Sequence, residues 1–239
     1  MGAGPSWLGI GAQRSGTDWV SRLLIQHPQV DFGTNGKKEQ AYLHIIPEGK
    51  LTEEGYLDLF PDDGLLRGEW SPYYMPSMIV PHIAARVTRD DTLIFALLRD
   101  PVERLASGMR LAKRAKRIPT DFHEPWVARA HQYGQYASSL EGWAVAFPRE
   151  RFVILTFEEA LEDVQKACEL FWGAMGLDPH RLADPYRKVK RPTEGTVDWN
   201  WPEGTREALI AHYLPQVKWL RDNWGVDVYR WRNFEEPLD

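Results

Sequence analysis

Residues 11–19 have the residue types of a phosphate-binding loop. They lie between the apolar run 7–10 and a helix-like pattern at 17–26. A loop between a buried strand and a helix directs backbone N–H groups at one point, and the helix dipole adds a positive end. Nucleotide triphosphatase loops carry a lysine where Thr17 stands, and the nearest cation here is Arg14. The segment therefore predicts a phosphate site of another kind, with a tight ligand-free turn as the alternative.

A second constellation follows the apolar run 92–98, where Arg99 comes directly after a predicted buried strand. Pro101 fits the first turn of a helix, and Ser107 lies eight residues beyond Arg99. A guanidinium fork and a hydroxyl together suit a terminal phosphate dianion. We expect a second anion site here, and an exposed arginine beside an ordinary helix cap is the alternative.

Apolar runs that predict strands alternate along the chain with stretches that predict helices. The predicted strands cover 7–10, 30–32, 92–98 and 152–157, with a strand end at 68–72. The predicted helices cover 17–26, 52–60, 158–175 and 205–223, with another starting at Pro101. This alternation favours one α/β domain over 1–239, with three layers and a mainly parallel, doubly wound sheet. Ligands of such sheets bind at the carboxyl ends of the strands, where both constellations lie.

Composition narrows the classes of function. The 239 residues carry 29 Lys plus Arg against 34 Asp plus Glu, so the net charge of −5 disfavours a general nucleic-acid binder and makes any anion site local. Cys168 is the only cysteine, so no disulfide can form within the chain. No secretory leader and no run of about 18 apolar residues is visible, so we expect a cytoplasmic protein without a membrane span.

The two constellations resemble motifs of the sulfotransferases that use PAPS (3′-phosphoadenosine-5′-phosphosulfate). Residues 14–21, RSGTDWVS, are similar to the 5′-phosphosulfate loop of that family, [KR]-[ST]-G-T-[TS]-x-[LV]. Residues 98–104, LRDPVER, followed by Ser107, are similar to its 3′-phosphate site, R-[DN]-P-x-x-R with a serine at the same interval. The resemblance implies the sulfotransferase fold with a P-loop-like loop, PAPS as co-substrate and no metal.

The resemblance also implies roles for single residues. Arg14 would be catalytic and donor-binding, because its counterpart contacts the transferring sulfuryl group and the leaving phosphate. The residues implied to hold the 5′-phosphate are Ser15, Gly16, Thr17 and Asp18. Asp18 departs from the pattern, since a hydroxyl residue is expected there and a carboxylate repels phosphate. Trp19 would stack on adenine, as in the cytosolic branch, and Arg99 with Ser107 would hold the 3′-phosphate.

Residues 37–42, KKEQAY, resemble the K-E-x-x-[FY] segment of the carbohydrate and bacterial branches, where the glutamate is the general base. Glu39 would thus take the proton of an attacking hydroxyl, a role worth about 10²–10⁴ in rate, while Lys38 would neutralise charge on the leaving phosphate. The cytosolic branch uses a histidine in K-x-H-x-P, which is absent, so His44 and His82 are less favoured bases.

Two further segments resemble the family less closely. Residues 68–74, GEWSPYY, are similar to G-E-K-[ST]-P-x-Y, which lines the cleft near the acceptor, but Trp70 replaces the lysine. The basic segment 187–191 resembles the R-K-G lid of cytosolic members, so Lys188 is a candidate nucleotide contact, although the glycine is missing. A solvated run of charges is an equal interpretation of this lid segment.

The predicted activity is transfer of a sulfuryl group from PAPS to a hydroxyl of a small-molecule or carbohydrate acceptor. A P-loop-like small-molecule kinase and a non-catalytic nucleotide- or glycan-binding relative are the alternatives. The basic stretch 104–117 fits either an acidic acceptor or a solvated helix face. Neither the acceptor nor the oligomeric state follows from the sequence.

Overall fold

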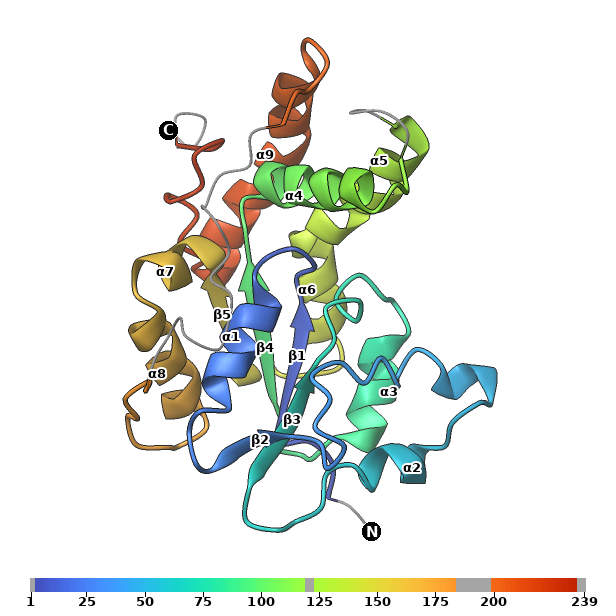
Figure 1. Ribbon diagram of the computed structural model, residues 1–239, viewed down its shortest axis with the longest axis vertical. Helices are drawn as coiled ribbons and strands as arrows, with labels where there is room; N and C mark the ends of the chain where they lie inside the picture. The colour runs from blue at the N-terminus through green and yellow to red at the C-terminus, as the bar shows by residue number, and fades with distance from the viewer. Residues whose placement is uncertain (1–2, 119–122, 184–198, 236–239) are drawn as a thin grey trace.

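The computed structural model describes residues 3–118, 123–183 and 199–235. It contains a five-stranded sheet in the order β2-β3-β1-β4-β5, in which every neighbouring pair is parallel. Helices cover both faces of this sheet, which gives three layers (Figure 1). The predicted α/β fold with a parallel central sheet is therefore confirmed.

The element bounds are as follows. The strands are β1 (Trp7–Gly11), β2 (Val30–Phe32), β3 (Leu66–Trp70), β4 (Leu93–Leu98) and β5 (Phe152–Thr156). The α-helices are α1 (Thr17–Leu24), α2 (Glu53–Leu57), α3 (Val80–Val87), α4 (Pro101–Arg114), α5 (Glu124–Ala130), α6 (Tyr136–Ala144), α7 (Phe157–Glu162), α8 (Val164–Ala174) and α9 (Thr205–Trp224). The 3-10 helices are η1 (Ile46–Glu48), η2 (His131–Gly134) and η3 (Arg149–Arg151).

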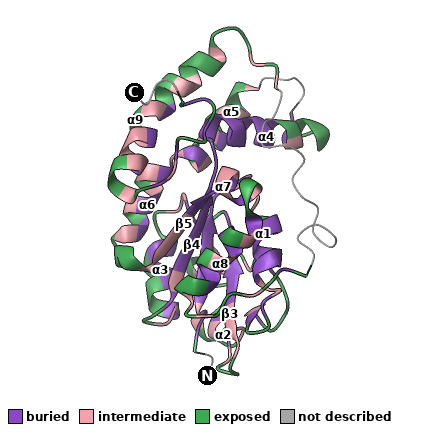
Figure 2. Cartoon of the chain, turned by 90° about the vertical axis from the view of Figure 1, so that its left-hand side faces the viewer, coloured by how far each residue is buried: buried purple, intermediate pink, exposed green. Residues whose placement is uncertain are grey.

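The sheet separates two apolar cores because successive side chains of a strand point to opposite faces. Leu8 and Ile10 of β1 pack with residues of α3, α6 and α9 in one cluster. Trp7 belongs to the other cluster, with residues of α1, α7 and α8. Figure 2 shows the strands buried along most of their length and the outer side of α9 exposed. Both faces of the sheet are thus covered, as the apolar strand sequences require.

Two tryptophan–glycine pairs join β1 to β3. The register places Trp7 opposite Gly68 and Gly9 opposite Trp70. Each indole occupies the space that a glycine leaves, because a Cβ on Gly9 would lie 2.2 Å from the Trp70 ring and a Cβ on Gly68 would lie 2.3 Å from the Trp7 ring. Trp70 is fully buried, and its Nε1 donates to the Gly11 carbonyl at 3.0 Å. It therefore supports the start of the loop after β1 and does not line the pocket.

Several helices differ from the sequence prediction. The helix predicted at 158–175 is divided into α7 and α8 at Asp163, whose carboxylate accepts from the Lys166 amide at 3.0 Å and caps α8. The helices α3, α5 and α6 were not predicted, and α2 is shorter than the predicted 52–60. Within the described part of the chain, no helix is long and apolar enough to span a membrane.

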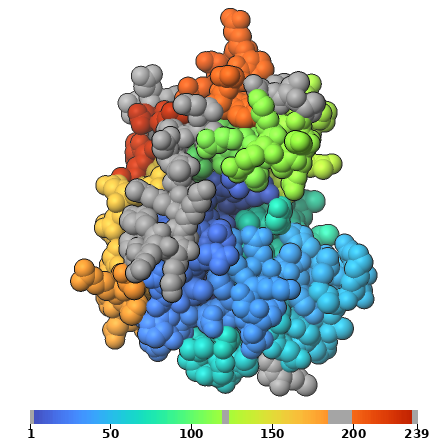
Figure 3. All heavy atoms as spheres, in the orientation of Figure 1, coloured from blue at the N-terminus to red at the C-terminus, as the bar shows by residue number. Residues whose placement is uncertain are grey.

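The helices α4 and α5 lie across the edge of the sheet that the carboxyl ends of the strands form (Figure 1). The loop after β1 and the start of α4 after β4 both emerge at this end, since β1 and β4 are parallel neighbours. Figure 3 shows a hollow on this face, where the deep-blue residues of the first loop are recessed beneath the green residues of α4.

Gly9→Ala tests the tryptophan–glycine packing. The new methyl group overlaps the buried Trp70 ring, so we expect the free energy of unfolding to fall by about 1–3 kcal/mol. Gly142→Ala in α6 is the matched control, because a Cβ there meets nothing within 4 Å. Alanine favours a helix over glycine, so this control should be neutral or stabilising by up to about 1 kcal/mol. Equal unfolding free energies of the two variants in urea would contradict the packing account.

Candidate active site

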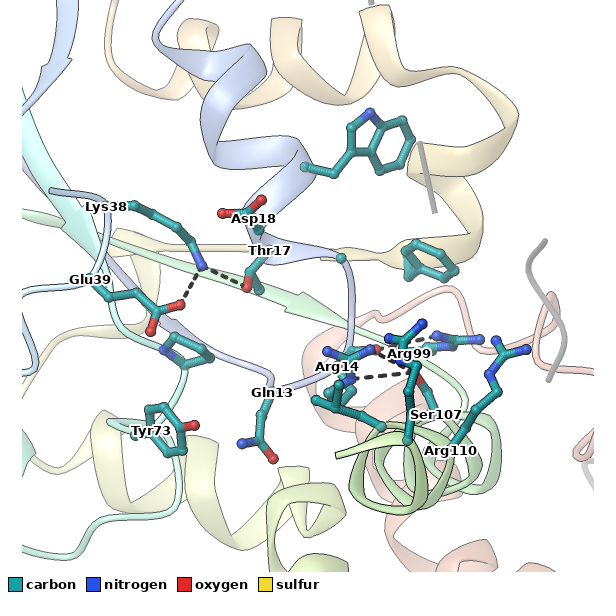
Figure 4. Close-up of a pocket in the computed structure, with 16 residues that line it drawn as sticks. Gln13, Arg14, Thr17, Asp18, Lys38, Glu39, Tyr73, Arg99, Ser107 and Arg110 are labelled. Carbon is teal, nitrogen blue, oxygen red and sulfur yellow. Dashed lines mark hydrogen bonds and ion pairs between the residues drawn. The ribbon is translucent and has the colours of Figure 1, made fainter. Parts of the chain in front are cut away.

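A pocket of about 500 Å³ opens at the carboxyl ends of the strands. It is lined by Gln13, Arg14, Gly16, Thr17, Asp18, Trp19, Lys38, Glu39, Pro72, Tyr73, Arg99, Ser107, Arg110, Leu111, Arg114 and Phe157. The pocket thus brings together most of the residues that the sequence singled out (Figure 4). Ser15 is fully buried beneath the loop and does not line the pocket. Lys188 lies outside the described residues.

The loop after β1 is held by backbone bonds and by a required glycine. The Ala12 amide donates to the Leu97 carbonyl of β4 at 2.8 Å, which fixes the loop to the neighbouring strand. Gly16 has φ 84°, and a Cβ there would lie 2.7 Å from the Phe157 ring. Gly16 is also the N-cap of α1 and provides no capping side chain. The first N–H groups of α1 are therefore left for a ligand at this end of the pocket.

Arg99 and Ser107 both line the pocket, Arg99 directly before α4 and Ser107 within it. The Asp100 carboxylate starts this helix by accepting from the Val102 and Glu103 amides at 2.9 and 3.2 Å. Arg99 is only 4% exposed, and its Nη1 donates to the Arg14 carbonyl at 3.3 Å. The sequence prediction that Arg99 and Ser107 converge on one place is consistent with this geometry, since both line the same pocket.

The side chain of Arg14 points toward α4. Its Nε and Nη2 both donate to the Ser107 Oγ at 3.3 Å. Arg14 has a left-handed backbone with φ 71°, which is uncommon for a residue with a side chain and marks a strained position. The loop backbone and the Ser107 contact together fix the guanidinium group beside the predicted 3′-phosphate site.

Positive charge accumulates at this end of the pocket. Burial lowers the pKa of Arg14, and the neighbouring guanidinium groups of Arg99, Arg114, Arg110 and Arg104 lower it further. Arg110 and Arg114 were not predicted as site residues, although the sequence marked their helix as basic. Neither forms an ion pair with a carboxylate of the described residues. Such a cluster is suited to a polyanion, which would relieve the repulsion between the arginines.

Lys38 and Glu39 lie at the opposite end of the pocket. Lys38 is 7% exposed, and its Nζ donates to the Thr17 Oγ1 at 3.3 Å and to the Glu39 Oε1 at 2.7 Å. The Glu39 side chain remains 40% exposed. A lysine ammonium, a threonine hydroxyl and an accessible carboxylate therefore meet at the N-terminus of α1. This grouping can bind an anion and accept a proton next to it.

A buried carboxylate holds the loop that carries Lys38 and Glu39. Glu69 is fully buried, and burial raises the pKa of its carboxyl group. Its Oε2 accepts from the Gln40 amide at 2.9 Å and from the Ser71 hydroxyl at 2.6 Å. The hydroxyls of Tyr56 and Tyr74 each donate to its second oxygen at 2.9 Å. Sequence reasoning treated this segment as cleft lining and missed its supporting role.

Two more hydrogen bonds hold the loop that carries Lys38 and Glu39 to the end of β3 and to Ser71. The Trp70 amide donates to the Lys38 carbonyl at 2.7 Å, and the Ala41 amide donates to the Ser71 Oγ at 3.1 Å. These bonds fix the main chain on both sides of Glu39. The carboxylate therefore projects from a rigid support, while its own oxygens stay accessible.

Asp18 and Trp19 occupy the first turn of α1. Asp18 lines the pocket, and its carboxylate pairs with Arg22 at 3.1 Å on the exposed side of the helix. Trp19 is 2% exposed and packs edge-on against Phe157 with ring centres 6.4 Å apart. Its buried Nε1 has no hydrogen-bond partner among the described residues. The stacking of Trp19 on adenine stays a prediction.

Aromatic side chains border the pocket near Glu39. Tyr73 and Pro72 line it, and Tyr73 is 43% exposed. The ring of Tyr73 meets that of Tyr133 edge-to-face, with centres 6.1 Å apart. This end can accept the flat side of a ring, because an exposed aromatic face is a favourable surface for one.

Glu158 interacts electrostatically with Arg99, and the pKa of its carboxyl group is raised. Burial, followed by the neighbouring Asp100, raises the pKa of its carboxyl group to about 8. Glu158 accepts from the Trp231 Nε1 at 3.0 Å and from the Asp100 amide at 3.3 Å. Because the carboxyl group binds a proton more tightly in the folded chain than in the unfolded chain, its contribution to stability is present at low pH and is lost as the pH rises toward 8.

Glu158→Gln tests this shift. Between about pH 5 and pH 8 the unfolding free energy of the wild type should fall by at most about 1.4 kcal/mol per pH unit because of Glu158. A glutamine stays neutral at all pH values, so this fall should be absent in the variant. Urea unfolding at several pH values measures it. Parallel pH profiles of the wild type and the variant would show that Glu158 is ionised throughout this range.

Comparison with known proteins gives the site its context. A family described as "Sulfotransferase domain" matches residues 6–170, which include the loop after β1, Glu39 and the Arg99–Ser107 pair. The "Membrane-associated sulfotransferase kil1" of Dictyostelium discoideum is 30% identical over 129 residues, covering 49% of this chain and 26% of the relative. The "Bifunctional heparan sulfate N-deacetylase/N-sulfotransferase 3" of Mus musculus is 25% identical over 205 residues, covering 74% of this chain and 23% of the relative. The chain thus spans about a quarter of the length of these curated relatives.

Solved structures show the same fold. A sulfotransferase from Alicyclobacillus acidocaldarius superposes with a TM-score of 0.76 at 22% identity, covering 95% of this chain and 98% of that chain. The sulfotransferase domain of the Synechococcus PCC 7002 olefin synthase has a TM-score of 0.53 at 15% identity, with 78% of each chain covered. At these identities the structures support the fold, while the family match covers more than half of the sequence. The chain therefore belongs to the sulfotransferase domain family.

Proposed function

We propose that this chain transfers a sulfuryl group from PAPS to a hydroxyl group of a small-molecule or carbohydrate acceptor. The observation that carries the proposal is a single pocket whose two ends carry different groups of side chains. At one end the N-terminus of α1 meets Lys38 and Glu39, and at the other end lie Arg99 and Ser107. A nucleotide with anionic groups at both the 5′ and 3′ positions can present one anionic group to each end.

The residues present fit the donor. The N–H groups at the start of α1 and the hydroxyl of Thr17 suit the 5′-phosphate, which the helix dipole favours at this place. Arg99 and Ser107 suit the 3′-phosphate, which is the role that their motif implies. Trp19 lines the same pocket, and its buried Nε1 has no hydrogen-bond partner among the described residues.

Glu39 is the proposed general base. It takes the proton of the acceptor hydroxyl as that oxygen bonds to sulfur, while the bond between sulfur and the oxygen bridging to the 5′-phosphate breaks. The hydroxyl must approach Glu39 to within about 2.6–3.2 Å, which the accessible carboxylate permits. Lys38 neutralises the charge that develops on the leaving phosphate. Lys38 pairs with Glu39 at 2.7 Å, so the donor's negative charge competes with the base for this lysine.

Arg14 belongs to the proposed donor-binding set. The resemblance gives it a catalytic contact with the sulfuryl group, whereas its guanidinium contacts Ser107 at the far end of the pocket. The charge next to Thr17 comes from Lys38. We therefore assign the leaving phosphate to Lys38 and keep Arg14 as a contact of the nucleotide.

Family membership disfavours the kinase alternative, because the matched family transfers sulfuryl groups. A non-catalytic relative differs from an enzyme only in turnover, so activity distinguishes the two. A cytoplasmic location and the identity of the acceptor stay predictions of the sequence. The exposed Tyr73 near Glu39 favours an acceptor with a ring.

Glu39→Gln tests the proposed base. The amide keeps the shape of the side chain and cannot accept the proton, so we expect kcat to fall by about 10²–10⁴. The affinity for PAP (adenosine 3′,5′-bisphosphate, the desulfated product) should stay within about threefold. Release of PAP from PAPS in the presence of phenol and neutral-sugar acceptors measures the rate.

Glu150→Gln is the control for this experiment, because Glu150 is an exposed carboxylate in η3 outside the pocket. It should retain the wild-type rate. Undiminished turnover of Glu39→Gln would exclude Glu39 as the base. Wild-type protein that binds PAP but shows no turnover with any acceptor would favour the non-catalytic alternative.

A further inference from the structure

Residues 231–233, which follow α9, each hydrogen-bond to a different buried acidic side chain that interacts with Arg99. The three pairs are Trp231 with Glu158, Arg232 with Glu103, and Asn233 with Asp100. We propose that the 231–233 segment positions the start of α4 for donor binding, with Asn233 as its principal positioning residue. This inference rests on the proposed function. The family match ends at residue 170, so it assigns no role to this segment.

Asn233 ties the start of α4 to α9. Its backbone N–H and its Nδ2 donate to the Asp100 Oδ2 at 3.1 and 2.7 Å, and its Oδ1 accepts from the Arg206 Nε at 2.9 Å. The other Asp100 oxygen caps α4 by accepting from the Val102 and Glu103 amides. Both oxygens of Asp100 are thus engaged, one by the helix and one by Asn233.

The first turn of α4 sets the positions of two pocket residues. Arg99 immediately precedes the cap residue Asp100, and Ser107 lies about two turns along the helix. A shift of the helix start therefore moves both side chains relative to the loop after β1. Asn233 does not line the pocket, so any effect that it has on a bound anion passes through Asp100.

The segment also stabilises negative charge around Arg99. Burial raises the pKa of the Asp100 carboxyl group, and hydrogen bonds from Asn233 counter this effect. The three acids together receive neutral N–H donors from Trp231 and Asn233 and a cation from Arg232. Less of their stabilisation therefore depends on Arg99, whose guanidinium also lines the pocket.

Apolar packing holds the segment independently of these hydrogen bonds. Val228, Trp231 and Phe234 are fully buried in the cluster that includes residues of α6 and α9. Figure 1 shows this part of the chain, in red, beside α7. A substitution that keeps the shape of Asn233 therefore changes its hydrogen bonds and leaves the apolar anchor in place. Such a variant separates a positioning role from a purely structural one.

Asn233→Asp is the first test, because it places a second carboxyl group against Asp100. Two carboxylates at this distance resist being ionised together, so their shared pKa is raised. Above that pKa they repel each other, and below it a shared proton restores a hydrogen bond like that of the amide. The other titratable and charged groups around the pair are Arg99, Glu103, Tyr136, Glu158, Arg206 and Arg232.

Calorimetric titration with PAP in EDTA measures the effect. We expect Asn233→Asp to bind PAP roughly tenfold more weakly than the wild type at about pH 8, and within about threefold of it at about pH 5.5. Asn223→Asp is the matched control, because Asn223 is exposed on α9 and its amide donates to the Trp219 carbonyl. Its PAP affinity should stay at the wild-type value at both pH values. Circular dichroism verifies that each variant is folded.

Arg232→Gln is the second test and spares the core, because the Arg232 side chain is 37% exposed. Without this cation the buried Glu103 carboxylate draws more strongly on Arg99, so PAP affinity should fall by about threefold or more. Arg230→Gln is the control from the same stretch, since Arg230 pairs with Asp227 and Glu162 instead. It should bind PAP as the wild type does.

Wild-type PAP affinity of Asn233→Asp at both pH values, with a lowered free energy of unfolding, would show a purely structural residue. An equal loss of affinity at both pH values would exclude the charge pairing with Asp100. Either result would overturn the inference and leave the proposed function standing. If Asn233→Asp does not fold, equal PAP affinities of Arg232→Gln and Arg230→Gln would overturn it. Wild-type protein that binds no PAP would contradict the proposed function as well.

Discussion

The parallel pairing of β1 with β4 is the constraint on which the site depends. It brings two strand ends to the same edge of the sheet, so the loop after β1 and Arg99 after β4 face one pocket. Two hydrogen bonds hold the loop after β1 against the end of β4. The Ala12 amide donates to the Leu97 carbonyl at 2.8 Å, and the Arg99 Nη1 donates to the Arg14 carbonyl at 3.3 Å. The backbone geometry therefore positions the two proposed anion sites at one pocket, and side-chain chemistry is added to that frame.

The packing beneath the site also helps to position the site residues. Trp70 fills the space above Gly9 and donates to the Gly11 carbonyl, where β1 passes into the phosphate loop. Its neighbour Glu69 points to the other side of β3 and gathers hydrogen bonds that fix the loop around Glu39. One strand thus supports both the donor loop and the proposed base, because adjacent residues of a strand project to opposite faces.

Sequence reasoning predicted the parallel sheet and the two phosphate motifs because local signals carry them: apolar runs, a glycine loop and a proline at a helix start. It did not predict the contact of Lys38 with Thr17 or that of Arg14 with Ser107, which join residues far apart in the chain. The inward position of Trp70 was also missed, because the segment was interpreted by its family resemblance, although Arg67 and Glu69 alternate with Trp70 along β3. The position of Arg110 and Arg114 at the pocket likewise required the structure.

The central claim is that the pocket recognises a nucleotide phosphorylated at both ends, without a metal. Its most direct measurement is calorimetric titration of the wild-type protein with PAP and with ADP, each in EDTA and again with magnesium. The account predicts micromolar PAP binding that magnesium leaves unchanged, and ADP binding at least tenfold weaker. Equal affinity for the two nucleotides, or ADP binding that requires magnesium, would contradict it and would point to phosphoryl rather than sulfuryl chemistry.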